Sequence, residues 1–352
     1  MSAVAELETP ALVVDLDRLE RNLGRAAAYA DEHGLGLHPH VKTHKTLEIA
    51  RMQLDGGARG LTVAKPTEAQ VFAAAELAPL LLHYPAAGPG KPERVAELAA
   101  TVPLTVAVDS LAVAEPIAAQ LRRRGVEAET LIELDVGLRR TGVTPGEAAE
   151  LGRAIEGLGG GLRVAGLSCY PAHDELAEVD ALLEQAQGLF AAAGLRCERI
   201  SGGSTATLFE SHRTRMTELR PGNYALLDRS EARGAFGPDD CALRVQATVV
   251  STSVQGRVIL DAGSKTLSEA APPAGERGFG AVVGHPEIVI EMLNEEHAIG
   301  SGGSETDLTV GDRVELIPNH VCTCVNLHDV LYAARGGEVE AEFAVAARGR
   351  VR

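Results

Sequence analysis

Short apolar runs alternate with stretches of helical period over the first two thirds of the chain. The runs are rich in Val, Leu and Ile, and the stretches between them are rich in Ala, Leu and Glu. Strands that are apolar on both faces and separated by helices are typical of a parallel sheet covered by helices. We therefore expect strands at 35–42, 60–64, 80–84, 104–108, 130–135, 164–170 and 197–200, with an eighth within 217–228.

Eight strand–helix units over about 220 residues match the size of a (β/α)8 TIM barrel. Near residue 238 the helical period fades, and β-like runs follow one another to the end of the chain. This change predicts a β-rich C-terminal domain, to which the early apolar run at 11–16 could pair back. The predicted division is a strand segment at 1–14 that joins the β domain, a barrel at 15–237 and a β domain at 238–352.

Composition narrows the class of partner and the compartment. The chain has 352 residues, of which 45% are hydrophobic, enough for one large domain or two ordinary ones. Its 49 acidic and 33 basic residues give a net charge of −16, and the only basic cluster is at 121–125, so nucleic acid is not an expected partner. No apolar run reaches about 18 residues, the length of a membrane span. Five cysteines without a CxxC pair fit a reducing cytoplasm better than a disulfide framework.

Lys42 stands in the segment "HPHVKTHKT", where the first predicted barrel strand ends. The C-terminal ends of barrel strands form the active site in this architecture. A lysine that is partly desolvated there has a lowered pKa and can attack an aldehyde as the free amine. An ordinary exposed loop lysine is the other interpretation, and this stretch alone favours it.

Two glycine turns follow the last predicted barrel strands, in "ISGGSTATL" at 200–208 and "RPGNY" at 220–224. Glycines let the backbone approach a ligand closely, and the N–H groups that follow them suit a phosphate. Each turn alone is more often only a turn. Together with a lysine at the end of the first strand, however, they indicate a site for a phosphate-bearing aldehyde cofactor.

The chain resembles the fold-type III enzymes of pyridoxal 5′-phosphate (PLP), which have an alanine racemase-like barrel followed by a β domain. Within them it is similar to the D-threonine aldolase and D-serine dehydratase branch. The resemblance runs from about residue 8 to the C-terminus and departs from the branch at His38, where relatives often have arginine. It rests on motifs that occur in family order: "PHVKTHK", "ELDVGLRRTGV", "GLSCY", "SGGSTATL", "ELRPGNY", "LDAGSK", "GHPEIVIEMLNEEH" and "IPNHVCTCVNLHD".

The resemblance implies roles for individual residues. Lys42 would bind the PLP aldehyde, Arg140 would lie near the pyridoxal O3′ atom, and Tyr170 would pack near the pyridine ring. The histidines beside Lys42 would belong to the cofactor pocket. The phosphate would be received largely by backbone N–H groups of Gly203, Ser204, Thr205, Gly222 and Asn223.

A metal pair is expected in "PNHVC". His320 and Cys322 are two residues apart, so on a strand both side chains would point to the same face. Imidazole and thiolate supply two ligands to a divalent cation, although this spacing alone is a weak signal. In the branch that the chain resembles, the matching pair binds a metal beside the substrate. Cys322 favours Zn²⁺ over Mg²⁺, while aldolase relatives often work with Mn²⁺ or Mg²⁺.

The resemblance implies PLP- and metal-dependent cleavage of D-3-hydroxy amino acids to glycine and an aldehyde, with Lys42 and His320 as catalytic residues. The alternative is a D-serine or D-3-hydroxyaspartate dehydratase that releases a 2-oxo acid and ammonia. A PLP-binding regulator is a third possibility, which the added β domain and the His-x-Cys pair disfavour. The expected partners are a small-molecule substrate and a second copy of the chain in a homodimer.

Overall fold

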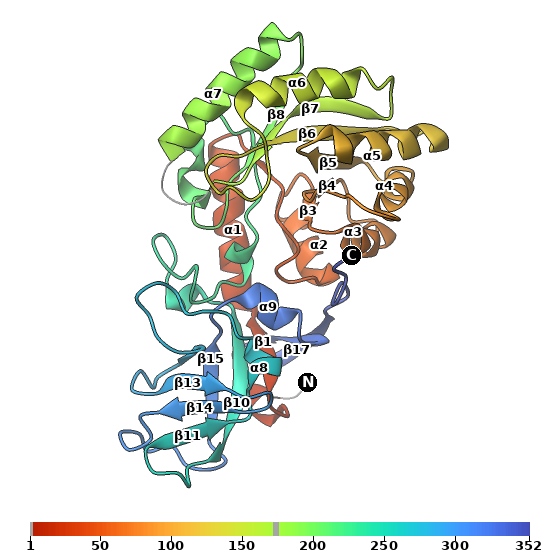
Figure 1. Cartoon of the computed structure of the whole chain (residues 1–352). Helices are drawn as coiled ribbons and strands as arrows, with labels where there is room; N and C mark the ends of the chain where they lie inside the picture. The colour runs from red at the N-terminus through yellow and green to blue at the C-terminus, as the bar shows by residue number, and fades with distance from the viewer. Residues whose placement is uncertain (1–2, 172–175) are drawn as a thin grey trace. The chain divides into compact units, whose positions relative to one another are not determined.

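The computed structural model describes residues 3–171 and 176–352, which form two compact units (Figure 1). The barrel unit consists of residues 25–42, 49–171, 176–222 and 350–352. The β unit consists of residues 3–24, 43–48 and 223–349. Helix α1 (Leu16–Glu32) contributes its first half to the β unit and its second half to the barrel unit.

Eight parallel strands line the described part of the barrel unit, in the order β2-β9-β8-β7-β6-β5-β4-β3. The two ends of this sheet meet, because His40 forms a parallel bridge with Thr62 and the Val41 N–H donates to the Thr62 carbonyl. The sheet therefore closes into a barrel. The strands are β2 (Gly36–Leu37), β3 (Leu61–Val63), β4 (Leu80–Leu82), β5 (Leu104–Val108), β6 (Ala128–Leu134), β7 (Leu162–Cys169), β8 (Arg199–Gly202) and β9 (Glu218–Leu219).

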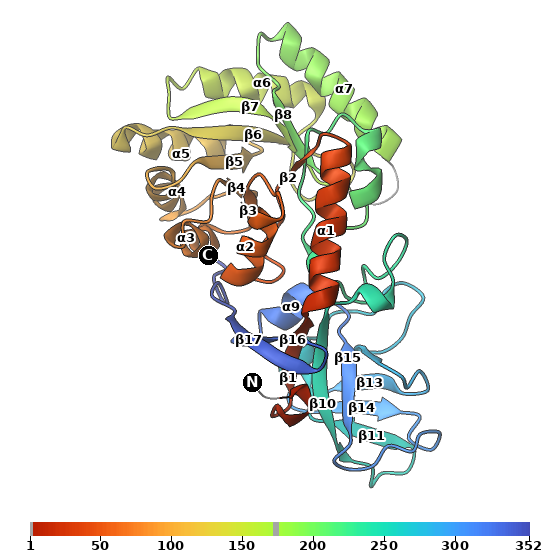
Figure 2. The same ribbon diagram turned by 180° about the vertical axis from the view of Figure 1, so that it is seen from behind.

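Helices cover the outside of these strands (Figure 1, and from behind in Figure 2). They are α2 (Leu47–Asp55), α3 (Pro66–Ala74), α4 (Lys91–Ala99), α5 (Leu111–Arg124), α6 (Pro145–Glu156) and α7 (Leu176–Ala192). Every residue of β4 and β5 is buried, as expected for strands packed on both faces. Leu81, Leu131 and Ala165 form part of the core. No helix of the described chain is long and apolar enough to cross a membrane.

A nine-stranded sheet forms the described β unit, in the order β11-β14-β13-β12-β15-β10-β1-β16-β17. Strand β1 pairs antiparallel with β10 and parallel with β16. The strands are β1 (Ala11–Asp15), β10 (Leu243–Ser251), β11 (Arg257–Leu260), β12 (Ala281–Val282), β13 (Val289–Leu293), β14 (Ala298–Ser301), β15 (Arg313–Ile317), β16 (Val330–Arg335) and β17 (Glu338–Ala344), with short helices α8 (Ser264–Leu267) and α9 (Val321–Val325). The predicted fold class, a TIM barrel followed by a β-rich domain, is confirmed.

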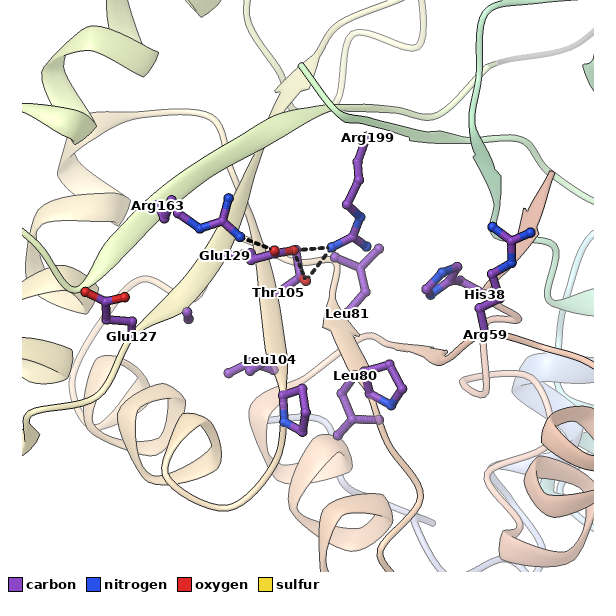
Figure 3. Close-up of a pocket in the computed structure, with 13 residues that line it drawn as sticks. His38, Arg59, Leu80, Leu81, Leu104, Thr105, Glu127, Glu129, Arg163 and Arg199 are labelled. Atoms are coloured by element: carbon purple, nitrogen blue, oxygen red, sulfur yellow. Dashed lines mark hydrogen bonds and ion pairs between the residues drawn. The ribbon is translucent and has the colours of Figure 1, made fainter. Parts of the chain in front are cut away.

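The N-terminal ends of the barrel strands hold an ion-pair network. Arg199, at the start of β8, donates to Glu218 at 2.9 and 3.0 Å. It also donates to Glu129 at 2.6 Å (Figure 3). His38 lies 3.5 Å from Glu218, and a cavity of about 510 Å³ opens beside this network. In barrels this face is structural. The placement of His38 with the cofactor pocket was wrong, because its ring packs toward the opposite end of the strands from Lys42.

Candidate active site

The C-terminal ends of the barrel strands carry the ionisable groups that the sequence motifs singled out. Lys42 follows β2 once the backbone pairing to Thr62 ends at Val41, and Tyr170 comes directly after β7. The Lys42 side chain is exposed, and its backbone N–H donates to the His40 ring at 3.4 Å. Because parallel strands all run the same way, these residues stand at one end of the barrel.

The pKa of His83, directly after β4, is affected by several cationic side chains. Its pKa lies well below the usual value, first because the ring is buried and then because of the positive charges of Arg220, Arg140 and Lys42. Three of the cations named in the motifs thus act on one imidazole. That imidazole is neutral at neutral pH.

Glu133, near the end of β6, faces the same imidazole. Its Oε2 lies 3.8 Å from His83 Nε2, and its Oε1 accepts from the Thr141 hydroxyl at 2.9 Å. Burial raises the pKa of this carboxyl group, while the charge of Arg220 opposes the rise. The sequence analysis did not select Glu133, because an acid in a strand gives no sign of its burial.

Arg140 and Tyr170, which the resemblance places near the cofactor, lie close to each other. The guanidinium carbon of Arg140 lies 5.3 Å from the centroid of the Tyr170 ring. At this distance the cation is attracted to the face of the ring. Arg140 is exposed in the loop after β6, and Tyr170 is half-buried.

Gly203, Ser204 and Thr205 follow β8, and all three are buried. Gly203 has a φ of +76°, and a Cβ atom there would lie 3.2 Å from Leu219 Cδ2. The Ser204 N–H donates to the Thr207 hydroxyl at 3.1 Å, and the Thr207 N–H returns a bond to the Ser204 hydroxyl at 3.2 Å. A phosphate that took the Ser204 N–H would therefore have to replace a bond that the turn already makes.

Gly222 and Asn223 belong to the second glycine turn, which follows β9. Gly222 is half-buried, while Asn223 is buried and begins the 3-10 helix η3 (Asn223–Ala225). The Asn223 amide donates to Asp228 Oδ2 at 2.6 Å. Its Oδ1 atom is buried and has no hydrogen-bond partner among the described residues.

Arg220 stands in the motif "ELRPGNY", but the motif alone did not predict a role for it. Its guanidinium is buried, and one of its terminal nitrogens donates to the Cys169 carbonyl at 2.5 Å. The Nε atom is buried without a hydrogen-bond partner in the described chain, and burial lowers the pKa of the group. A buried donor without a partner is costly, so this atom is positioned for an acceptor that is not part of the protein. The available signal was an arginine just after the last barrel strand.

His320 and Cys322 do come together, but not on a strand. His320 is the residue before helix α9 and Cys322 lies in its first turn, so the strand geometry assumed from the spacing was wrong. Asp228 Oδ2 accepts the Val321 N–H at 2.7 Å, and this bond favours a helical start. A hydrogen bond between the His320 and Cys322 side chains still joins the pair.

Asp228 fixes the orientation of the His320 ring. Its Oδ2 atom lies 3.2 Å from His320 Nδ1. This bond, followed by the one to Cys322, raises the pKa of His320 to about 10. The contact with Asp228 keeps a proton on Nδ1, so that the neutral ring would present Nε2 to a cation, as is usual when a carboxylate holds a metal-binding histidine.

His320 and Cys322 would supply only two ligands to a metal ion. Among the described residues, no group of three or more His, Cys, Asp or Glu side chains could hold a metal ion. A pair of imidazole and thiolate leaves positions for water or substrate, which a catalytic metal requires. Cys322 Sγ lies 3.3 Å from the Thr43 hydroxyl, and Thr43 is the residue after Lys42 in the chain. Cys324 instead is buried and donates to the Thr266 carbonyl at 3.1 Å, which is a structural contact.

Comparison with known families identifies the barrel. A family model described as alanine racemase, N-terminal domain, matches residues 14–229. The chain belongs to this family. A serine dehydratase domain model matches residues 242–334, which covers most of the β-strands after the barrel. The resemblance stated from the sequence motifs is thereby confirmed.

Individual relatives match over nearly the whole chain. A D-threonine aldolase from an Arthrobacter species is 34% identical over 98% of this chain and 94% of its own length. The D-threo-3-hydroxyaspartate dehydratase of Delftia sp. HT23 is 33% identical over 98% of this chain and 96% of its own. The crystal structure of a D-threonine aldolase from Filomicrobium marinum has a TM-score of 0.90 at 30% identity and covers 99% of this chain and 98% of that one.

One further solved structure bears on the metal pair. It is described as a cysteine-to-alanine mutant of D-threo-3-hydroxyaspartate dehydratase in the metal-free form, and it has a TM-score of 0.86 at 32% identity, covering 98% of this chain and 99% of that one. With these relatives, the chain is a PLP-dependent lyase of the alanine racemase-like fold.

Proposed function

We propose that the protein cleaves D-3-hydroxy amino acids to glycine and an aldehyde by a retro-aldol reaction that needs PLP and a divalent metal. The observation that carries the proposal is the pair His320 and Cys322, joined to each other and attached through Cys322 to Thr43, the neighbour of Lys42. Aldolases among the relatives, at 34% and 30% identity over nearly the full chain, support the same reaction.

The residues at the barrel end fit PLP. Lys42 would bind the aldehyde of the cofactor through its amine. Arg220 Nε is a buried donor available for a polar atom of the cofactor. Gly203 has no side chain at a position where a Cβ atom would come close to Leu219. When bound, PLP supplies the electron sink that makes cleavage next to the α-carbon possible.

Residues of the β unit fit a metal. His320 Nε2 and the Cys322 thiolate would be the protein ligands, and Asp228 would hold the imidazole in the required tautomer. Bound there, a divalent cation supplies Lewis acidity toward the β-hydroxyl of the substrate. The relative described as a metal-free form supports a metal in this branch. Of Mn²⁺, Mg²⁺ and Zn²⁺, the thiolate favours Zn²⁺.

The dehydratase reaction is the second candidate, because the Delftia relative is a dehydratase at 33% identity. The same residues would then assist loss of the β-hydroxyl group and removal of the α-proton, and the products would be a 2-oxo acid and ammonia. Lys42 is the proposed base in that case. Fold does not separate the two reactions, because the chemistry depends on the site.

The test is product analysis with two matched cysteine variants. The full-length protein is supplied with PLP and, in turn, Mn²⁺, Mg²⁺ or Zn²⁺, and is given D-threonine, D-serine or D-3-hydroxyaspartate. We expect metal-dependent glycine and aldehyde, abolished in Cys322→Ala and kept in Cys324→Ala, since Cys324 packs against the Thr266 carbonyl. A 2-oxo acid with ammonia would instead establish the dehydratase, and equal activity of both variants would refute the metal assignment.

We propose that the active form is a homodimer, which light scattering would show as twice the monomer mass.

A further inference from the structure

One buried carboxylate holds groups from both proposed binding sites. Asp228 is fully buried. Its Oδ2 atom accepts from the Asn223 side-chain amide at 2.6 Å, from the Val321 N–H at 2.7 Å and lies 3.2 Å from His320 Nδ1. Its Oδ1 atom accepts from the Glu231 N–H at 3.1 Å. The carboxylate is therefore held on both oxygens.

Asn223 and His320, which both contact Asp228, belong to the binding sites of different proposed ligands. Asn223 lies in the turn that would receive the cofactor phosphate, and His320 is one of the two residues that would hold the metal. The Asn223 side-chain oxygen has no hydrogen-bond partner in the described residues, whereas its amide nitrogen donates to Asp228. Any change in the position of the turn at Asn223 must therefore act directly on the carboxylate that orients His320.

We propose that Asp228 couples the two sites, so that PLP binding tightens metal binding and metal binding tightens PLP binding. This inference rests on the proposed function. A phosphate bound at this turn would hold the Asn223 amide against Asp228 Oδ2, the same atom that faces His320 Nδ1. A metal on His320 would act on that carboxylate from the other side, so each ligand would favour the arrangement that the other needs. Because binding free energies are linked, both affinities must change by the same factor.

The size of the coupling follows from the general range of such effects. Coupling between two binding sites is typically at least about five-fold in affinity. Removal of the carboxylate that orients a metal-binding histidine weakens the metal by about 10- to 100-fold. Asp228 acts through His320 and Asn223, so we describe it as a positioning residue.

The test measures binding, not turnover. Full-length protein is freed of PLP and metal, and Zn²⁺ is titrated by calorimetry with and without saturating PLP. PLP is titrated by its absorbance with and without saturating Zn²⁺. The Zn²⁺ site is identified by its loss in Cys322→Ala. We expect each ligand to tighten the other by the same factor, at least about five-fold.

Three variants separate coupling from folding. In Asn223→Ala, PLP at a concentration that saturates the variant should no longer change the Zn²⁺ affinity, because the bond from Asn223 to Asp228 is lost. Asp228→Asn should weaken Zn²⁺ by about 10-fold or more. Asp261→Asn is the matched control, because Asp261 accepts from the Thr248 N–H at 2.7 Å and from the Thr9 hydroxyl at 2.6 Å and contacts neither site. This control should keep the wild-type coupling.

The outcomes distinguish this inference from the function on which it rests. If the wild type binds both ligands with affinities that do not depend on each other, the coupling is refuted and the proposed function stands. Full coupling in Asn223→Ala refutes the route through Asp228. If the wild type binds neither PLP nor Zn²⁺, the proposed function and the coupling both fail. Should Asp228→Asn not fold, as circular dichroism would show, Asn223→Ala still decides.

Discussion

Replacing Arg199 by methionine should destabilise the barrel without touching the chemistry. The guanidinium at the start of β8 makes four contacts within 3.0 Å. Two are to Glu218, and the others, to Glu129 and the Thr105 hydroxyl, are drawn in Figure 3. Methionine keeps much of the apolar length of the side chain but leaves two carboxylates without their partner. The change therefore tests the interpretation that this end of the barrel is structural.

The magnitude follows from how deeply the partners are buried. Removing one member of a buried ion pair costs about 3 to 5 kcal/mol, because the remaining charge is left without compensation. The Glu218 side chain is only 6% exposed, so this cost applies to it, whereas Glu129 is 34% exposed and water can solvate it. We expect Arg199→Met to lower the free energy of unfolding by about 3 kcal/mol.

The loss of unfolding free energy in Arg199→Met should depend on pH. Burial alone would raise the pKa of Glu218, but the charges of His38 and Arg199 and the hydrogen bonds from Arg199 outweigh it and lower the pKa. An acid with a lowered pKa in the fold contributes stability above its unfolded value of about 4.5, and this contribution disappears as the pH falls through the folded pKa. The gap between wild type and variant should therefore be widest at neutral pH and narrow below about pH 4.5.

Urea unfolding followed by far-UV circular dichroism measures this gap, since the chain has no tryptophan. Arg196→Met is the matched control, because that side chain is 76% exposed and its pair with Glu198 is worth less than about 1 kcal/mol. Equal, small losses in the two variants would refute the energetic argument. Loss of PLP binding in Arg199→Met would refute the assignment of this face to stability.

Three further substitutions test the opposite end of the barrel. Lys42→Ala should abolish both activity and the visible absorbance of lysine-bound PLP, which a spectrum after dialysis checks. Below pH 6.5 the unfolding free energy should fall less steeply with falling pH in His83→Gln than in the wild type, by at most about 1.4 kcal/mol per pH unit, because the lowered pKa makes the unfolded chain bind the proton first. The control is His297→Gln, at an exposed position, which should not change this slope. Equal slopes of unfolding free energy against pH for both variants, measured by urea melts, would contradict this. Gly203→Ala should weaken PLP, measured by absorbance titration, because φ is +76° and the methyl group meets Leu219; the helical control Gly24→Ala has an open position and should bind PLP as the wild type does.

The barrel was predictable because its strands are buried on both faces. Leu80–Leu82 is apolar throughout and Leu104–Val108 is apolar except at Thr105, and the structure buries every one of these residues. The resemblance to a PLP family also followed from short motifs, and the family match confirms it. The boundary near residue 237 and the roles of individual site residues stay predictions.

The geometry of the site depended on contacts that spacing cannot reveal. A two-residue interval fits a strand or the start of a helix, and His320 stands at a helix start because Asp228, about 90 residues earlier, accepts the Val321 N–H. Arg220 and Glu133 look like ordinary charged residues in the sequence. Only their burial in the closed barrel marks them, and burial depends on the whole fold.

The carbon–carbon cleavage is the central claim, and D-threonine in deuterated water tests it most directly. Mass spectrometry would follow the products formed by the full-length protein with PLP and Zn²⁺ or Mn²⁺. The account predicts acetaldehyde and glycine, with a single solvent deuteron on the α-carbon of glycine, because the bond lost to the aldehyde is replaced by a bond to a proton from water. A 2-oxo acid and ammonia without glycine would contradict it.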